Sequence, residues 1–164
     1  MRLFIARHAE TVPNMNGISV DQTMHNVLTD LGRAQAGMLA KHLRERSIDY
    51  IYASDILRTL ATAYVISDAM PEITLMLTKD LRAKDSKESA AAFEVRISNF
   101  VRGLRQKYDK HNVLLITHSD VISQIRSALV GKPAEVDLAS ITELLLGPNE
   151  EIREATINFT EHLN

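Results

Sequence analysis

Short apolar segments alternate with longer amphipathic segments along most of the chain, and this alternation constrains the fold more than any other feature. A run of about five apolar residues is typical of a strand that is buried on both faces of a sheet. Apolar residues spaced three or four apart indicate a helix with one buried face. Strands that alternate with helices indicate a parallel sheet covered by helices. The sequence therefore predicts an α/β fold, a three-layer α/β/α sandwich with a mostly parallel mixed sheet.

The predicted elements can be placed along the chain from these patterns. Strands are expected over residues 2–6, 48–53, 73–77, 112–117, 140–146 and 151–159. Helices are expected over residues 29–46, 54–70, 89–108 and 120–130. Thr29 is a favourable N-cap for the first helix, and Ser54 or Asp55 can cap the second. Gly131 is expected to end the fourth helix, and residues 147–149 to form the turn between the last two strands.

Two polar stretches are predicted to be loops. The first follows the first strand and contains Pro13, Asn14, Asn16 and Gly17. The second covers residues 78–89 and carries four cations, which are Lys79, Arg82, Lys84 and Lys87. We expect these cations to form a solvated face, and the alternative is that they attract an anionic substrate.

Composition excludes several classes of function. The chain contains no cysteine, which rules out disulfides, cysteine-ligated zinc and thiol catalysis. Its formal net charge of -2 gives no reason to expect binding to nucleic acid. The apolar run at residues 3–6 is too short for a signal peptide or a membrane helix. We therefore expect a cytoplasmic protein that contacts neither nucleic acid nor membrane.

Two histidines and two arginines fall at points where they can meet. Arg7 and His8 follow the first strand, Arg58 lies in the first turns of the helix after the second strand, and His118 follows the strand at 112–117. Ligands of open α/β sheets bind outside the carboxyl ends of the strands. Guanidinium groups bind phosphate oxygens in pairs, and a neutral imidazole can attack phosphorus. No metal-ligand spacing accompanies these residues, so a phosphate group is the expected ligand.

Four motifs that contain these residues resemble, in the correct order, those of the histidine phosphatase (phosphoglycerate mutase-like) superfamily. Residues 7–11 read Arg-His-Ala-Glu-Thr, where the family has Arg-His-Gly-Glu-Thr. Residues 28–36 resemble its Leu-Thr-x-x-Gly-x-x-Gln-Ala helix start. Residues 52–63 resemble its Ser-(Ser/Asp)-x-x-Arg-(Ala/Thr)-x-x-Thr-Ala block. Residues 113–119 are similar to its second catalytic-histidine strand, with Ser119 where the family usually has Gly.

The resemblance implies a role for each matched residue. His8 would accept the phosphoryl group, and Arg7 and Arg58 would hold its oxygens. His118 would bind the same oxygens and stabilise the transition state. Asn14 would line the rim of the pocket. The resemblance implies no metal and no cofactor, and a single phosphoglycerate mutase-like domain over residues 1–164 without a large cap insertion.

The sequence departs from the family at one chemically important position. Ala83 stands where the family places the glutamate that protonates the leaving group. Either Asp85 or Glu88 replaces it, or no strong acid is present, and general acid catalysis typically contributes about 10²–10⁴-fold. Substrates with good leaving groups would suffer least, and phosphohistidine on a protein is such a substrate. A short form resembling bacterial phosphohistidine phosphatases is therefore favoured.

Two other functions remain open at the level of sequence. One is a small-molecule phosphomonoesterase or a phosphoglycerate mutase-like enzyme. The other is a catalytically weak module that binds phosphate or a protein partner. The expected partner is accordingly a phosphorylated small molecule or a protein that bears phosphohistidine, and the sequence predicts no particular oligomeric state.

Overall fold

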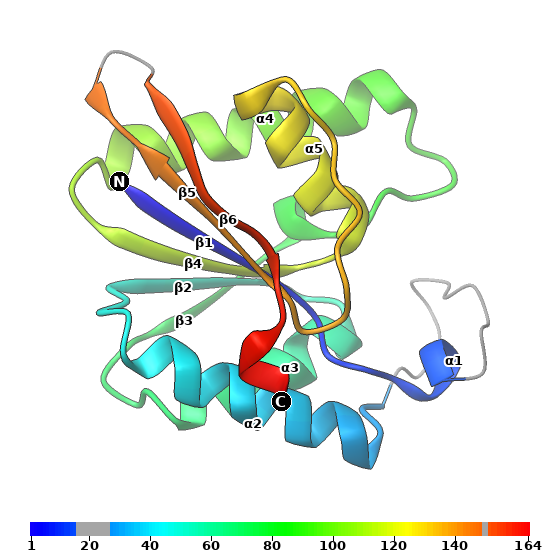
Figure 1. Cartoon of the computed structure of the whole chain (residues 1–164). Helices are drawn as coiled ribbons and strands as arrows, with labels where there is room; N and C mark the ends of the chain where they lie inside the picture. The colour runs from blue at the N-terminus through cyan, green and yellow to red at the C-terminus, as the bar shows by residue number, and fades with distance from the viewer. Residues whose placement is uncertain (16–26, 149–150) are drawn as a thin grey trace.

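The computed structural model describes residues 1–15, 27–148 and 151–164, and it places one mixed sheet between two layers of helices (Figure 1). The strands are β1 (Arg2–Arg7), β2 (Tyr50–Ser54), β3 (Leu75–Thr78), β4 (Asn112–Thr117), β5 (Ile141–Leu146) and β6 (Ile152–Phe159). Their order in the sheet is β3-β2-β4-β1-β5-β6. Neighbours among the first four are parallel, whereas β5 is antiparallel to β1 and to β6. The predicted α/β/α fold with a mostly parallel mixed sheet is confirmed.

The helices divide between the two faces of the sheet (Figure 1). One face is covered by α2 (Asp30–Arg44) and α3 (Leu57–Asp68), and the other by α4 (Ala90–Lys107) and α5 (Ser119–Val130). Three short helices complete the described chain, which are α1 (Val12–Met15), η1 (Lys79–Leu81) and η3 (Glu161–Leu163). No helix among the described residues is long and apolar enough to cross a membrane.

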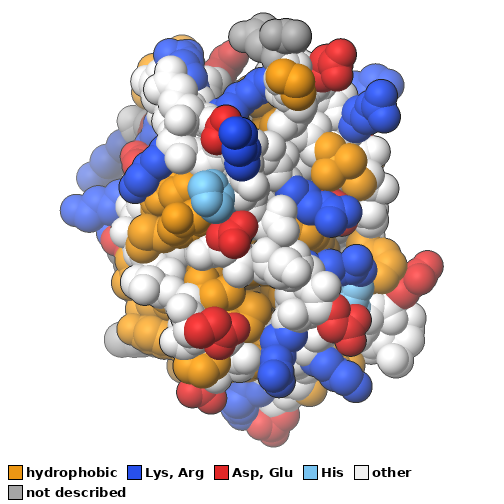
Figure 2. All heavy atoms as spheres, turned by 90° about the vertical axis from the view of Figure 1, so that its left-hand side faces the viewer, with side chains coloured by type: hydrophobic (Ala, Val, Ile, Leu, Met, Phe, Trp, Pro, Cys, Tyr) orange, Lys and Arg blue, Asp and Glu red, His pale blue; other side chains and the backbone are white. Residues whose placement is uncertain are grey.

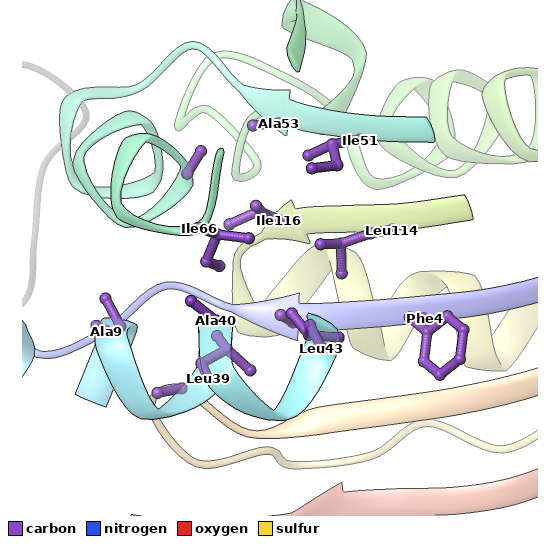
Figure 3. Packing of buried hydrophobic residues seen from close by; sticks show 14 of the residues in the cluster. Phe4, Ala9, Leu39, Ala40, Leu43, Ile51, Ala53, Ile66, Leu114 and Ile116 are labelled. Atoms are coloured by element: carbon purple, nitrogen blue, oxygen red, sulfur yellow. The ribbon is translucent and has the colours of Figure 1, made fainter. Parts of the chain in front are cut away.

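The core has two halves because successive side chains of a strand point to opposite faces. Phe4 and Ala6 of β1 pack in the cluster under α2 and α3, and Figure 3 shows Phe4 there with Leu39, Leu43 and Ile66. Leu3 and Ile5 of the same strand pack in the cluster under α4 and α5. Both halves therefore fix β1, whose carboxyl end carries Arg7 and His8.

Local differences from the sequence prediction lie mainly at element ends. The prediction that Ser54 or Asp55 caps α3 is wrong, because the N-cap is Ile56 and no side chain caps it. Asp55 instead accepts two hydrogen bonds from Arg82, at 2.6 and 2.7 Å. The helix α1 replaces part of the predicted first loop. The predicted loop residues 16 and 17 and the turn residue 149 lie outside the described residues.

The stretch 78–89 is more structured than the predicted solvated loop. It begins with η1, and Leu81 in that helix is fully buried. The Thr117 hydroxyl at the end of β4 donates to the Leu81 carbonyl at 2.7 Å. Together with the Arg82–Asp55 ion pair, this bond holds the stretch against the carboxyl ends of β2 and β4.

The opposite end of the sheet lacks the predicted catalytic groups. Figure 2 shows this face, where Lys and Arg side chains are interspersed with Asp and Glu. A cavity of about 830 Å³ near the N-terminus is lined by Met1, Arg105 and Leu146 among others. None of the four predicted catalytic residues lines it, so its size alone does not make it the site.

Candidate active site

His8 is buried immediately after the end of β1. The residue is only 4% exposed to solvent. Its backbone N–H donates to the Thr117 carbonyl at 3.0 Å. That bond continues the pairing of β1 with β4 by one step. The imidazole is therefore held at the carboxyl edge of the sheet, as predicted.

Hydrogen bonding fixes which nitrogen of His8 carries the proton. Nδ1 lies 2.9 Å from the Ala9 carbonyl, which can only accept, so Nδ1 donates and Nε2 keeps its lone pair. Burial, followed by the charges of Arg58 and Arg7, lowers the pKa of His8 to about 3, although the Ala9 bond opposes the shift. The ring is thus neutral at neutral pH, with a nucleophilic Nε2.

His118 follows β4 and lies beside His8, with ring centroids 5.6 Å apart. Its Nδ1 accepts a hydrogen bond from Arg58 Nε at 3.2 Å. Its Nε2 therefore bears the proton and lies 3.0 Å from Ser54 Oγ and 3.1 Å from Thr59 Oγ1. Both ring nitrogens are engaged with protein groups, so the imidazole positions Arg58. A direct bond to a phosphoryl oxygen requires one of these contacts to open.

Two donors of the arginines have no partner among the described residues. Arg7 Nη1 donates to the Val136 carbonyl at 2.6 Å, whereas Arg7 Nε and Arg58 Nη1 are buried and make no hydrogen bond within the described part of the chain. Leaving a buried donor unpaired costs about 1–3 kcal/mol, and more when the group is charged. An anion that accepts from both guanidinium groups removes this cost. The chemistry of the donors therefore fits a phosphoryl group.

Hydroxyl groups of α3 connect the motif at residues 7–11 to the motif at residues 52–63. The sequence analysis did not identify these hydroxyl groups as part of the site. Thr62 Oγ1 accepts from the Ala9 N–H at 3.1 Å and donates to the Arg58 carbonyl at 3.0 Å. Thr59 and Ser54 orient His118 as described above. All three residues lie within the block at 52–63, so their spacing in that motif is the signal that could have identified them.

The structure does not bring every predicted residue to the centre. Asn14 Oδ1 accepts from the Thr11 N–H at 3.2 Å and from its hydroxyl at 2.6 Å, which fastens α1. The Asn14 Nδ2 group, the donor that a phosphate would need, takes no part in these bonds. The observed bonds of Asn14 therefore stabilise the local turn at Thr11.

The two acid candidates bond to groups other than the four central residues in the described part of the chain. Glu88 binds Arg96 through two hydrogen bonds of 2.8 and 2.7 Å, and this pairing holds the pKa of Glu88 below its usual range. Asp85 Oδ1 accepts from the Lys87 N–H at 2.8 Å within its own turn. Both line a cavity of about 360 Å³ that none of the four central residues lines. Among the described residues, neither carboxylate makes a hydrogen bond to any of the four central residues.

A cavity of about 650 Å³ opens at the same sheet edge, and Arg7 is the one of the four central residues in its lining. Arg7 lines it together with Ser119, Asp120, Val136 and other residues of the same edge. Among the described residues, no group of three or more His, Asp or Glu side chains is arranged to hold a metal ion. A neutral imidazole at the same sheet edge as two guanidinium groups is an arrangement whose chemistry suits phosphoryl transfer.

Comparison with known proteins places the chain within one family. Residues 3–85 and 78–156 match the family described as histidine phosphatase superfamily (branch 1). The chain belongs to this superfamily, and its enzyme class is that of a phosphatase. The resemblance seen in the sequence is thereby confirmed, while the closer likeness to phosphohistidine phosphatases stays a prediction.

Individual relatives agree with this assignment. The adenosylcobalamin/alpha-ribazole phosphatase of Escherichia coli (strain K12) is 28% identical over 167 residues, covering 82% of this chain and 82% of the relative. A phosphoserine phosphatase mutant from Entamoeba histolytica, solved in complex with phosphoserine, has a TM-score of 0.86 at 17% identity, covering 99% of each chain. A phosphoglycerate mutase from Bacillus anthracis str. Sterne has a TM-score of 0.87 at 17% identity, covering 99% of this chain and 95% of that one. The two structural likenesses show the fold alone.

Acidification from about pH 7 to about pH 5 is expected to destabilise the fold. Burial holds the pKa of four histidines below the ordinary value of about 6.5, and these are His8, His118, His42 and His162. Below that value the unfolded chain binds more protons than the folded chain, so the free energy of unfolding decreases as the pH falls. Urea denaturation across this range measures it, and an unchanged free energy of unfolding would contradict the expectation.

Proposed function

We propose that this chain is a metal-independent phosphatase that hydrolyses small phosphorylated molecules through a phosphohistidine intermediate on His8. The observation that carries the proposal is the neutral His8 ring, whose Nε2 lone pair lies at the same sheet edge as two unpartnered guanidinium donors. We further propose that residues 1–164 act as a single domain without a large cap, and that Asn14 lies at the pocket rim.

The reaction follows from these groups in two half-reactions. The Nε2 lone pair of His8 attacks phosphorus, and the bond to the leaving oxygen breaks with its electron pair remaining on that oxygen. Water then attacks phosphorus, and the electron pair of the phosphorus–nitrogen bond returns to Nε2. Arg7 and Arg58 donate to the phosphoryl oxygens throughout, while His118 holds Arg58 in place.

The class of substrate is proposed from the relatives together with the site. Their names include a phosphatase of alpha-ribazole, a phosphoserine phosphatase and a phosphoglycerate mutase. A second candidate substrate is phosphohistidine on a protein. Ala83 favours it, because a neutral imidazole leaves without the acid that the family supplies from that position.

Hydrolysis of p-nitrophenyl phosphate in the presence of a metal chelator tests the proposal. We expect turnover, and acid-labile, base-stable phosphate on the protein after rapid quenching. Phosphoserine, 3-phosphoglycerate and a phosphohistidine peptide, compared at equal concentration, then rank the substrate classes. Stimulation by a bisphosphorylated activator would indicate a mutase. Binding of vanadate without any turnover would replace the proposal with a phosphate-binding module.

A further inference from the structure

A carboxylate outside the predicted set lies at the active-site cavity. Asp120 is in the first turn of α5, two residues after His118, and it lines the cavity of about 650 Å³ with Arg7. Burial lowers the pKa of both arginines, and the charge of Asp120 opposes that shift for Arg7 and for Arg58. Asp137 acts in this way on Arg7. Asp120 therefore lies at the same cavity as Arg7, one of the two arginines proposed to bind the phosphoryl oxygens.

The Asp120 carboxylate also reaches the stretch that follows η1. Its Oδ2 accepts a hydrogen bond of 2.7 Å from the backbone N–H of Lys84, and its Oδ1 accepts from the N–H of Val121 at 2.9 Å. Lys84 directly follows Ala83, the position at which the family carries its glutamate. The Asp120 carboxylate of α5 is thus bound to the backbone directly after Ala83.

We propose that Asp120 is the catalytic base that activates water for hydrolysis of phospho-His8. Its carboxylate lines the same cavity as Arg7 and is held there by two backbone N–H groups, and a carboxylate positioned in this way can take a proton from water. This assignment rests on the proposed function, since it needs the phosphorylated His8 as its substrate.

The step conserves atoms and charge with water as the only co-reactant. A water in the cavity gives one proton to an Asp120 oxygen while its own oxygen bonds to phosphorus. The phosphorus–Nε2 bond breaks, and its electron pair returns to His8. Asp120 then releases the proton to solvent. In this scheme Asp120 acts only in the second half-reaction and gives no proton to the leaving group in the first. Substrates with good leaving groups are therefore favoured, as the absence of glutamate at residue 83 also indicates.

Rapid-quench kinetics of Asp120→Asn with p-nitrophenyl phosphate test whether Asp120 acts in hydrolysis of phospho-His8 and not in its formation. The amide keeps an oxygen that can accept from Lys84 but cannot take a proton from water. We expect the burst of p-nitrophenol to remain within about 3-fold of wild type. We expect decay of phospho-His8 to slow by about 10²-fold or more, so that the phosphoenzyme accumulates.

Asp49→Asn is the matched control. Asp49 Oδ2 also accepts from a backbone N–H, that of Asn112 at 2.7 Å, but it lies at the amino end of β4 and does not line the cavity. This variant removes the same charge and should leave phosphoenzyme decay unchanged. In Asp120→Ala, added formate should restore decay, because a small carboxylate can enter the vacated space and act as the base.

The outcomes separate this inference from the function on which it rests. Phospho-His8 that decays at the wild-type rate in Asp120→Asn overturns the assignment of Asp120 and leaves the proposed function standing. Equal slowing of burst and decay, without rescue of Asp120→Ala by formate, also overturns it, because the residue then only shapes the site. Absence of phospho-His8 in wild type overturns the proposed function itself, and the role of Asp120 with it.

Discussion

Replacing His8 with Ala is expected to lower kcat toward p-nitrophenyl phosphate by at least about 10⁴-fold, since loss of a covalent nucleophile removes the whole two-step route. The His8 ring is neutral, and its Nε2 lies at the same sheet edge as the two arginines. The neighbouring imidazole of His118 is a poor substitute, because both of its nitrogens already bond to Arg58, Ser54 and Thr59.

The measurement must separate loss of chemistry from loss of binding. Arg7 and Arg58 remain in His8→Ala, so vanadate should still bind and still raise the melting temperature. His42→Ala removes a histidine that packs against Phe159 and His162, and it should retain turnover. Residual activity in His8→Ala within about 10-fold of wild type would show that phosphorus is attacked by another group, such as water.

Much of the fold and of the site centre could be predicted from the sequence because the signals are local and strong. The strand at residues 112–117 was predicted with the observed bounds of β4, because this run is strongly apolar and such a run is typical of a buried strand. Arg7, His8, Arg58 and His118 meet because each follows or adjoins the carboxyl end of a parallel strand. Because β2, β4 and β1 are adjacent in the sheet, residues that lie far apart in the sequence come together at one edge.

Other features depend on tertiary contacts that no local pattern encodes. The stretch after β3 reads as a solvated loop, yet its position follows from the Arg82–Asp55 pair and from the Thr117–Leu81 bond. Asp120 reads as an ordinary residue of a helix start, and its proximity to Lys84 arises only when α5 packs beside that stretch. The partners of Glu88 and Asp85, which are Arg96 and the Lys87 N–H, could not be predicted for the same reason, because a charge in sequence does not reveal its partner.

Replacing Gly32 with Ala is expected to lower the free energy of unfolding by about 3 kcal/mol and to reduce turnover as well. A Cβ at this position would lie 2.0 Å from the backbone oxygen of Glu10 and 2.9 Å from its carbonyl carbon. Backbone cannot move aside as a flexible side chain can, and overpacking typically costs about 1–3 kcal/mol, occasionally more. The gain in helix propensity from Gly to Ala, about 1 kcal/mol, is too small to offset it.

The activity effect follows because the start of α2 is bound to the segment that carries His8. The Thr29 N–H donates to the Glu10 carbonyl at 3.2 Å, and the Thr29 hydroxyl donates to the Glu10 carboxylate at 2.7 Å. Displacing Glu10 strains these bonds two residues from His8, the proposed nucleophile. Gly37→Ala in the same helix is the matched control, since a Cβ there meets nothing within 4 Å, and it should stabilise the fold by about 0.5–1 kcal/mol. Urea denaturation and p-nitrophenyl phosphate turnover of both variants measure the difference, and equal stability of the two would refute close packing of α2 on Glu10.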